Sequence, residues 1–170
     1  MILTAIYTGM RKGEIQALTW KDLDFLHSTI NVNKSWDEKE KAFKPTKTAS
    51  SNRVIKVNQQ LLKWLADLKV NSSTMVFQNV WGTIPTSTGL NKTLRKILND
   101  CGIEKQGFHF HSLRHVHVAY LLGQGVDVYA ISKRLGHSNV TITLDTYSYL
   151  IDEYRAKSDE LIITKLANLD

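Results

Sequence analysis

The sequence lacks the features of a disulfide-stapled or membrane-spanning protein. Its one cysteine, Cys101, can form no disulfide within the chain and supplies no set of thiolates for a metal, as is usual in a reducing compartment. No apolar run approaches the roughly 20 residues that a membrane-spanning helix requires, and residues 1–14 lack the flanks of a signal peptide. We therefore expect a cytoplasmic protein that makes no membrane contact.

Prolines are also scarce, and with only two of them no stretch has the composition of a linker. The sequence shows no internal repeat and no low-complexity tract. Its 170 residues are enough to bury one sizeable core. We expect a single domain, residues 1–170.

Acidic residues are outnumbered by basic ones. The chain has 16 Asp and Glu against 22 Lys and Arg, a net charge of +6 and a pI near 9.4. A positive field of this kind attracts polyanions, of which nucleic acid is the usual one. Many basic proteins of this size bind no nucleic acid, so the sequence motifs are needed to decide whether this one does.

The hydrophobic pattern predicts a mainly helical α+β fold with a small three-stranded antiparallel sheet near the N-terminus. The predicted strands are the β-prone segments 28–34, 41–45 and 53–58. Residues 139–147 (NVTITLDTY) combine β-branched side chains with helical neighbours, and we expect a helix there. Periodicity and glycine stops predict the other helices at about residues 2–8, 11–19, 61–68, 90–101, 110–123, 128–135 and 152–168.

Two arginine-containing motifs could each bind an anion. In TGMRKGE, Arg11 and Glu14 share a predicted helical face; such ion pairs are common, but the same geometry could hold an arginine against a phosphate. In FHFHSLRH, His111 and Arg114 also share a face, and a guanidinium with an imidazole matches phosphate oxygens. His111 and His115 have the i, i+4 spacing of a zinc pair. However, no HExxH pattern accompanies them, and Arg114 would lie beside the metal.

Four further residues with polar side chains have both an ordinary and a chemical interpretation. His137 follows the helix-ending Gly136 in KRLGHSN, where a histidine is usually an ordinary loop residue. Lys47 is predicted at a hairpin tip between the second and third strands, where a lysine is most often a solvated charge. Tyr147 and Tyr149, in LDTYSYL, either pack in the core or carry out chemistry.

The motifs occur along the chain in the order TG.R..E, KT..S.R, H..R, LGH and T..TY. This order, which extends from about Tyr7 to Tyr154, resembles the catalytic domain of the tyrosine recombinases, the phage-integrase family. The resemblance implies a site-specific recombinase that cleaves and rejoins DNA through a 3′-phosphotyrosine, without cofactor or metal. It assigns catalytic roles to Arg11, Lys47, His111, Arg114, His137 and Tyr147, and a supporting role to Glu14.

The resemblance also implies how the catalytic groups divide the chemistry. Tyr147 is the expected nucleophile, and because a tyrosine hydroxyl has an ordinary pKa of about 10 it needs help to lose its proton. His111 is the expected acceptor of that proton. His137 is expected to hydrogen-bond a phosphate oxygen, and Lys47 to protonate the departing 5′ oxygen. The two arginines would stabilise the charge of the transition state.

The sequence departs from the pattern of the resembled family in three respects. Ser112 stands where the family often has Asp, and Tyr149 where it often has His, but neither change removes a catalytic group. Tyr149 and Tyr154 are then expected to pack or to line the surface. The N-terminal DNA-clamping domain of the family has no counterpart here and the first helix is short, so we expect a catalytic fragment.

Double-stranded DNA is the expected partner. The last helix, which is amphipathic, is expected either to dock on its own domain or to be exchanged between protomers of a tetramer on DNA, as the resemblance implies. A monomer in isolation, away from DNA, stays open as well. Basic residues on two helices are predicted to contact DNA outside the site: Lys92, Arg95, Lys96, Lys133 and Arg134.

Three other functions stay open at this level. A type IB topoisomerase would relax DNA by similar chemistry, a non-catalytic module could bind DNA with the same fold, and a metal-dependent hydrolase could use the histidines. The LGH and TG.R.GE boxes favour a recombinase, and a binding module has no use for a nucleophile. The target site and the direction of the reaction do not follow from the sequence.

Overall fold

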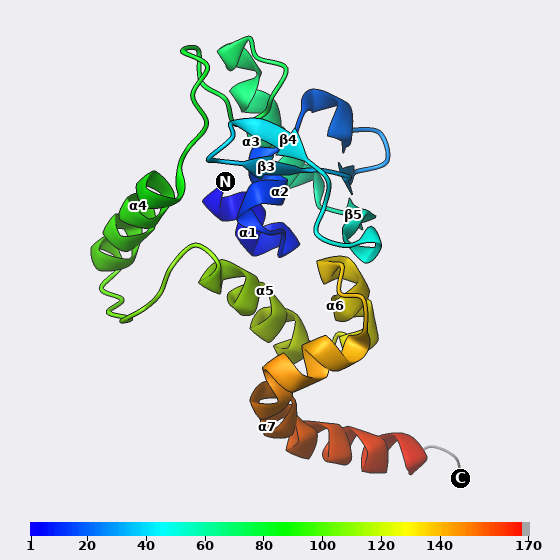
Figure 1. Ribbon diagram of the computed structural model, residues 1–170. Coiled ribbons are helices and arrows are strands. Elements are labelled where there is room, and N and C mark those ends of the chain that lie inside the picture. Colours follow the sequence, from blue (N-terminus) through cyan, green and yellow to red (C-terminus); the bar gives the residue numbers. More distant parts are fainter. Residues whose placement is uncertain (168–170) are drawn as a thin grey trace.

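A computed structural model describes the backbone of residues 1–167 and the side chains of that range other than 149–158, 160 and 161. The predicted fold class, mainly helical with small antiparallel sheets, is confirmed (Figure 1). No helix within residues 1–167 is both long and apolar enough to cross a bilayer. The α-helices are α1 (Ile2–Thr8), α2 (Lys12–Gln16), α3 (Gln59–Ala66), α4 (Ser87–Asp100), α5 (Ser112–Gly123), α6 (Val128–Leu135) and α7 (Val140–Leu166). The strands are β1 (Leu23–Asp24), β2 (Thr29–Val32), β3 (Ser35–Asp37), β4 (Ala42–Lys44) and β5 (Arg53–Lys56), and the 3₁₀ helices are η1 (Trp20–Asp22), η2 (Ala49–Ser51) and η3 (Asp67–Asn71).

The strands form two sheets, and their pairing differs from the prediction. β1, β2 and β5 form one sheet in that order, whereas β3 pairs with β4 in a separate sheet. Leu23 lies opposite Ile30, and Ile30 opposite Ile55, so one buried apolar row crosses the larger sheet. β4 buries no side chain, and its Phe43 packs edge-on against Trp36 at 5.4 Å between ring centres. The short strand β1 therefore takes the place in the larger sheet that the sequence predicted for residues 41–45.

The main hydrophobic core lies where α1, α2 and α3 meet the larger sheet. Asn58 starts α3 by accepting the backbone N–H of Leu61 at 2.9 Å, which gives this helix a defined first turn. Helix α1 also packs against α5, so the C-terminal helices are attached directly to this core. The buried members include Ala5, Ile15, Leu18, Ile30, Ile55, Leu61, Leu65, Leu90 and Leu94.

A second apolar cluster lies between α5, α6 and the start of α7. It consists of Val118, Ile131, Leu135 and Tyr147, with Leu121 and Leu122 packed against it. The prediction of a helix over residues 139–147 is confirmed, and this helix continues into the last one. The single helix α7 has non-helical backbone angles at Tyr147, with φ −122° and ψ 15°. Beyond this break its C-terminal part extends away from the rest of the molecule (Figure 1).

Gly9 and Gly136 end α1 and α6, and the turns that follow these helices carry residues of the site. Gly9 follows α1 with φ 65°, and Gly136 follows α6 with φ 71°, the left-handed conformation that glycine adopts without strain. A Cβ on Gly9 would lie 2.6 Å from Cδ2 of His117, and one on Gly136 would lie 3.0 Å from Nη1 of Arg53. A side chain at Gly9 would therefore clash with His117, and one at Gly136 would press on Arg53 and on the carbonyl of Ser50. The turns after α1 and α6 can in this way approach α5 and β5 closely.

Candidate active site

Arg11 directly precedes α2, and Glu14 holds it at two points. The Glu14 carboxylate accepts the Arg11 backbone N–H at 2.9 Å and Nη1 of Arg11 at 3.0 Å. The Arg11 side chain is 30% exposed and that of Glu14 only 3%. The predicted ion pair is therefore present, with a buried carboxylate and a guanidinium that solvent or a ligand can reach.

Arg53 of β5, the last residue of the KT..S.R motif, binds the same carboxylate, although no role for it was expected. Its Nη2 lies 2.9 Å from Oε2 of Glu14, and its Nε donates to the carbonyl of Arg134 at the end of α6 at 2.7 Å. Burial alone would raise the pKa of Glu14, but the hydrogen bonds and charges of Arg53 and Arg11 outweigh it and lower that pKa. The strand pattern contains the missed signal. Arg53 shares a strand face with the buried Ile55, and an arginine directed inward needs an anionic partner.

Arg114 lies in the centre of the site and is held by backbone carbonyls from two other elements. It is 4% exposed, and it donates to Gly9 O at 2.5 Å and to Leu135 O at 2.9 Å. Its Nη2 also lies 3.0 Å from Nε2 of His137. Burial, together with the charge of Arg11, lowers the pKa of Arg114 to about 9, which leaves the guanidinium charged at neutral pH. Three of its five N–H donors are thereby used, so at most two can serve a ligand.

His137 contacts Arg114 through one ring nitrogen and the start of α7 through the other. Because arginine can only donate, Nε2 of His137 must accept the bond from Arg114, and the ring proton lies on Nδ1. Nδ1 therefore donates to Oγ1 of Thr143 at 2.8 Å. Burial and the charges of Arg114, Arg11 and Arg53 lower the pKa of His137 to about 4. The ring is neutral at pH 7 and fixed in one tautomer.

Tyr147 is buried and hydrogen-bonded to a histidine other than the predicted one. It is 2% exposed, and its hydroxyl lies 2.9 Å from Nδ1 of His115. The two rings are 5.5 Å apart between centres, at 57°. The charge interaction of Tyr147 with Arg114 places the hydroxyl within electrostatic range of the predicted arginine. Tyr149 and Tyr154 were expected to pack or line the surface, and their side chains lie outside the described residues.

His111, the predicted proton acceptor, lies at the N-cap of α5 and is exposed. Its ring stands edge-on to that of His115 at 5.3 Å and stacks beside His109 at 6.4 Å. Partial desolvation lowers the pKa of His111, and His115 and Arg114 lower it further. His111 therefore lies within range of the charge of Arg114, with its ring open to solvent.

Lys47 is exposed on the connection between β4 and β5. The predicted hairpin is wrong, because these two strands belong to different sheets. The segment after Lys47 instead approaches the end of α6, where the carbonyl of Ser50 would lie 3.1 Å from a Cβ on Gly136. Ser50, Arg53 and His137 line one cavity of about 510 Å³. Lys47 thus precedes a segment that contacts the site directly.

The residues predicted to contact DNA outside the site fall into two groups that the structure keeps apart. Lys92, Arg95 and Lys96 are exposed on α4, which Figure 1 shows on the far side of α5 from α6. On α6, Lys133 is exposed, with its Nζ 5.2 Å from the centre of the Tyr129 ring. Arg134 is bound internally: its guanidinium donates to the carbonyls of Lys56 and Tyr7, at 2.9 Å each, and to Nε2 of His117 at 3.2 Å.

The histidines of α5 do not form a larger cluster of metal ligands within the described part of the chain. No group of three or more His, Cys, Asp or Glu side chains there is arranged to hold a metal ion. The rings of His111 and His115 lie beside each other, as their i, i+4 spacing predicts. Arg114, which lies between the two histidines in the sequence, is the charged residue nearest to both.

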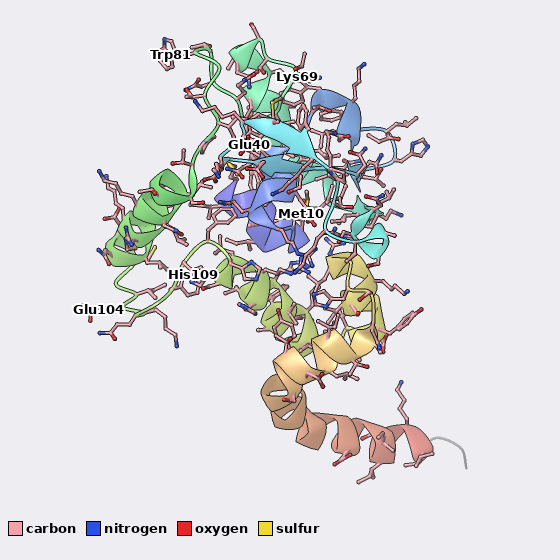
Figure 2. The ribbon with its side chains drawn as sticks, viewed as in Figure 1. Met10, Glu40, Lys69, Trp81, Glu104 and His109 are labelled. Carbon is pink, nitrogen blue, oxygen red and sulfur yellow. The ribbon has the colours of Figure 1, made fainter. Side chains whose placement is uncertain are left out.

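The site as a whole brings together two arginines, a buried carboxylate and a neutral histidine, with the buried Tyr147 within electrostatic range of Arg114. Arg11 and Glu14 come from the α1–α2 turn, Arg114 from α5 and His137 from the α6–α7 turn. Figure 2 shows side-chain nitrogens gathered near Met10, between the α1–α2 region, α5 and α6. Guanidinium groups with fixed positions match the oxygens of a phosphate. The arrangement can therefore bind a phosphodiester.

Solved structures show which class of fold this is. The chain matches the Tn1549 transposon integrase, solved in complex with transposon right end DNA, with a TM-score of 0.77 and 24% identity over 95% of this chain and 57% of that one. It matches the catalytic domain of bacteriophage HP1 integrase with a TM-score of 0.58 and 17% identity over 94% of this chain and 78% of that one. The fold is that of an integrase catalytic domain.

Sequence comparison identifies the family. The model of the phage integrase family matches residues 1–153, and the chain belongs to this family. It is 29% identical to the XerC-like tyrosine recombinase of Caldanaerobacter subterraneus subsp. tengcongensis over 95% of its length, and 31% identical to the ICEBs1 integrase of Bacillus subtilis over 93%. It covers 48% and 47% of those two proteins, and so spans about half the length of these curated relatives.

Proposed function

We propose that this chain is the catalytic domain of a site-specific recombinase that cleaves and rejoins DNA strands through a 3′-phosphotyrosine. The observation that carries the proposal is the convergence of Arg11, Arg114 and His137 from three separate elements, with the buried Tyr147 within electrostatic range of Arg114. A DNA-binding module would gain nothing from holding a tyrosine there. The family and the integrase fold support the same function.

The two arginines stabilise the negative charge that grows on the non-bridging oxygens as Tyr147 attacks phosphorus. Arg114 is fixed by the carbonyls of Gly9 and Leu135 before any substrate arrives, so little reorganisation is needed in the reaction. Arg11 is more exposed and completes the phosphate site from the turn after α1. Both charges are permanent, and we propose that the reaction requires no metal and no cofactor.

We propose that Lys47 protonates the 5′ oxygen that leaves. Its segment lies beside the cavity lined by Arg53 and His137, and a lysine on an exposed connection can approach the leaving group once DNA is bound. His137 is neutral in the free protein. A phosphate beside it would favour its protonated form, which can donate to a phosphate oxygen.

We propose double-stranded DNA as the partner, bound outside the site through the exposed Lys92, Arg95, Lys96 and Lys133. Contacts of this kind act on the phosphate backbone, so the affinity should fall steeply with salt. Arg134 belongs to the same proposal, although its described bonds are internal. The reaction would take place in the cytoplasm, on the DNA of a mobile element.

We further propose that α7 is exchanged between protomers of a tetramer on DNA. The described apolar side chains near its end, Ile162, Ile163 and Leu166, are 54%, 69% and 58% exposed in the single chain. Burial of such side chains against a neighbouring domain is favourable, by about 25 cal/mol per Å² of apolar surface. The same exposure argues against docking of this segment on its own domain.

The proposal is tested by trapping a covalent complex. The protein is incubated with a pool of nicked duplexes of randomised sequence, in which the short cleaved strand diffuses away and religation is prevented. Adducts resistant to denaturation should form with the wild-type protein in the presence of EDTA and should disappear with Tyr147→Phe. Tyr120→Phe, which alters an exposed tyrosine of α5, is the matched control and should react normally.

Two results would contradict the proposal. One is an adduct that persists in Tyr147→Phe, which would exclude this residue as the nucleophile. The other is a wild-type yield no higher than that of Tyr147→Phe with every duplex in the pool. A duplex recovered from the wild-type adduct then serves as the defined substrate for all rate measurements below.

A further inference from the structure

The hydroxyl of Tyr147 has a hydrogen-bond partner to which no role has been assigned. Nδ1 of His115 lies 2.9 Å from it. The expected proton acceptor, His111, is one helical turn earlier on α5, and its described ring contacts are with His109 and His115. The hydrogen bond to Tyr147 thus distinguishes His115 from His111, although the sequence places both histidines on one face of α5.

The backbone explains why Tyr147 meets His115. His111 lies at the exposed start of α5, whereas His115 lies one turn further along, where α5 packs against α7. The non-helical backbone of Tyr147 interrupts α7, and its ring packs in the cluster with Val118 of α5. The contact with His115 is therefore part of a packed interface between two helices.

We propose that His115 is the group that takes the proton from Tyr147 when the hydroxyl attacks the scissile phosphate. The inference rests on the proposed function and names a residue for one of its steps. The O–H bond of Tyr147 breaks and an N–H bond forms at Nδ1 of His115, while a bond forms from the tyrosine oxygen to phosphorus. The bond from phosphorus to the 5′ oxygen breaks, and that oxygen takes a proton from the general acid, Lys47. In the rejoining step His115 returns its proton to the tyrosine.

The charges around His115 keep it in the form that can accept a proton. Its pKa is lowered by burial first, and then by Arg114 on the same helix and by His109 on the preceding loop. The other titratable groups that face it are His111, Tyr147 and Lys105, the last of which lines the same cavity. A neutral ring with its proton on Nε2 can accept the tyrosine hydrogen at Nδ1.

A cavity next to the ring allows the protonated form to be solvated. It measures about 410 Å³, and His115 lines it together with Lys105, Phe108, Ser112 and Thr146. An imidazolium formed during the reaction would therefore not be enclosed on every side by apolar groups.

Single-turnover cleavage of the defined duplex tests the proposal with two variants of His115. His115→Asn keeps a hydrogen-bonding group near the Nδ1 position but cannot take a proton, and we expect adduct formation to slow by about a hundredfold or more, since general base catalysis usually contributes at least that much. His115→Ala should be slowed similarly and partly restored by added imidazole, in proportion to the unprotonated form. His27→Gln, at an exposed histidine paired with Asp24, is the control and should react at the wild-type rate.

The pH dependence and the leaving group separate a proton acceptor from a residue that only positions the tyrosine. The wild-type rate should fall in acid as His115 is protonated, and this acid limb should be absent in His115→Asn. A duplex with a 5′-bridging sulfur, whose thiolate leaves without a proton, should restore cleavage in Lys47→Ala but not in His115→Asn. Unfolding midpoints and non-covalent DNA affinity, measured in parallel, show that each variant is folded.

The possible results separate the role of His115 from the proposed function of the whole site. His115→Asn within about threefold of the wild-type rate, or with an unchanged acid limb, would overturn the inference and leave the proposed function intact. Loss of the limb in His111→Asn alone would transfer the role to His111. Failure of imidazole to restore any activity to a folded His115→Ala would reduce His115 to a positioning residue. A wild-type protein that forms no adduct would instead remove the proposed function.

Discussion

Individual side chains in this site carry charge in places from which water is largely excluded. Arg114 and Glu14 are 4% and 3% exposed, and each is held by several bonds before substrate arrives. Charges interact more strongly where water is scarce, and fixed donors need no rearrangement as the transition state forms. Arg11 differs because it is partly exposed, and its only described ion-pair partner is Glu14.

Substitution of Arg11 tests the role of a single fixed cation. We expect Arg11→Ala to slow cleavage of the defined duplex on the order of a hundredfold, by analogy with the loss of one preorganised donor. Arg11→Lys should restore only part of the rate, because an ammonium cannot contact two phosphate oxygens in the same way. Lys63→Ala, at an exposed lysine of α3, controls for the loss of charge. A loss below tenfold for Arg11→Ala would argue against direct phosphate contact.

The elements differ in how far the sequence could predict them. The ends of α1 and α6 were predicted because Gly9 and Gly136 act locally, within one turn of chain. The strand pairing was not predicted correctly. Pairing depends on which side chains become buried against the rest of the fold, and the strand segments alone do not determine this. The contacts made by Arg53 and His115 were missed for the same reason. Their contacts with Glu14 and Tyr147 join positions 39 and 32 residues apart, and no local period encodes them.

Arg53 connects three elements, and a double-mutant cycle measures that connection. Arg53→Ala leaves the buried Glu14 with Arg11 alone and leaves the carbonyl of Arg134 without this donor, so we expect a loss of about 3–5 kcal/mol in the free energy of unfolding. Glu14→Gln removes the buried charge, and the double variant should lose clearly less than the sum of the single ones. Urea unfolding gives the three values. Additivity to within about 0.5 kcal/mol would show that the two residues are not coupled.

The molecule as a whole is joined across α5, which contributes to both apolar clusters. Leu113 belongs to the main core and Val118 to the second cluster, so a single helix fixes the two sides of the site relative to each other. His117, on the same helix, is bound to the carbonyl of Ile6 and to Arg134, which ties α1 and α6 to it. A site built from scattered positions of the sequence depends on this helix for its geometry.

His117 and His137 should make the folded protein less stable in acid. The pKa values of His117 and His137 are lowered to about 4, mainly by burial, from an ordinary value of 6.5. The unfolded chain therefore binds protons first as the pH falls, and stability is lost between about pH 6.5 and about 4. From pH 7.5 to 5, the nearly buried His117 should lower the free energy of unfolding by about 2 kcal/mol, and the more exposed His137 should lower it by less because solvent screens its charge.

Urea unfolding at several pH values checks this expectation. His117→Gln should reduce the loss between pH 7.5 and 5 by about 2 kcal/mol relative to the wild-type protein. His27→Gln, at an exposed position, should leave the loss unchanged. An equal pH dependence in the wild-type protein and His117→Gln would show that this histidine is not held neutral in the folded state.

The most direct test of the central claim is to identify the atom that becomes attached to DNA. The covalent complex formed on the nicked duplex is digested with trypsin and nuclease, and the peptide that retains a nucleotide is sequenced by mass spectrometry. We predict that the modified residue is Tyr147, linked to a 3′ phosphate. A nucleotide on Tyr149 or Tyr154, or on a 5′ phosphate, would contradict the account.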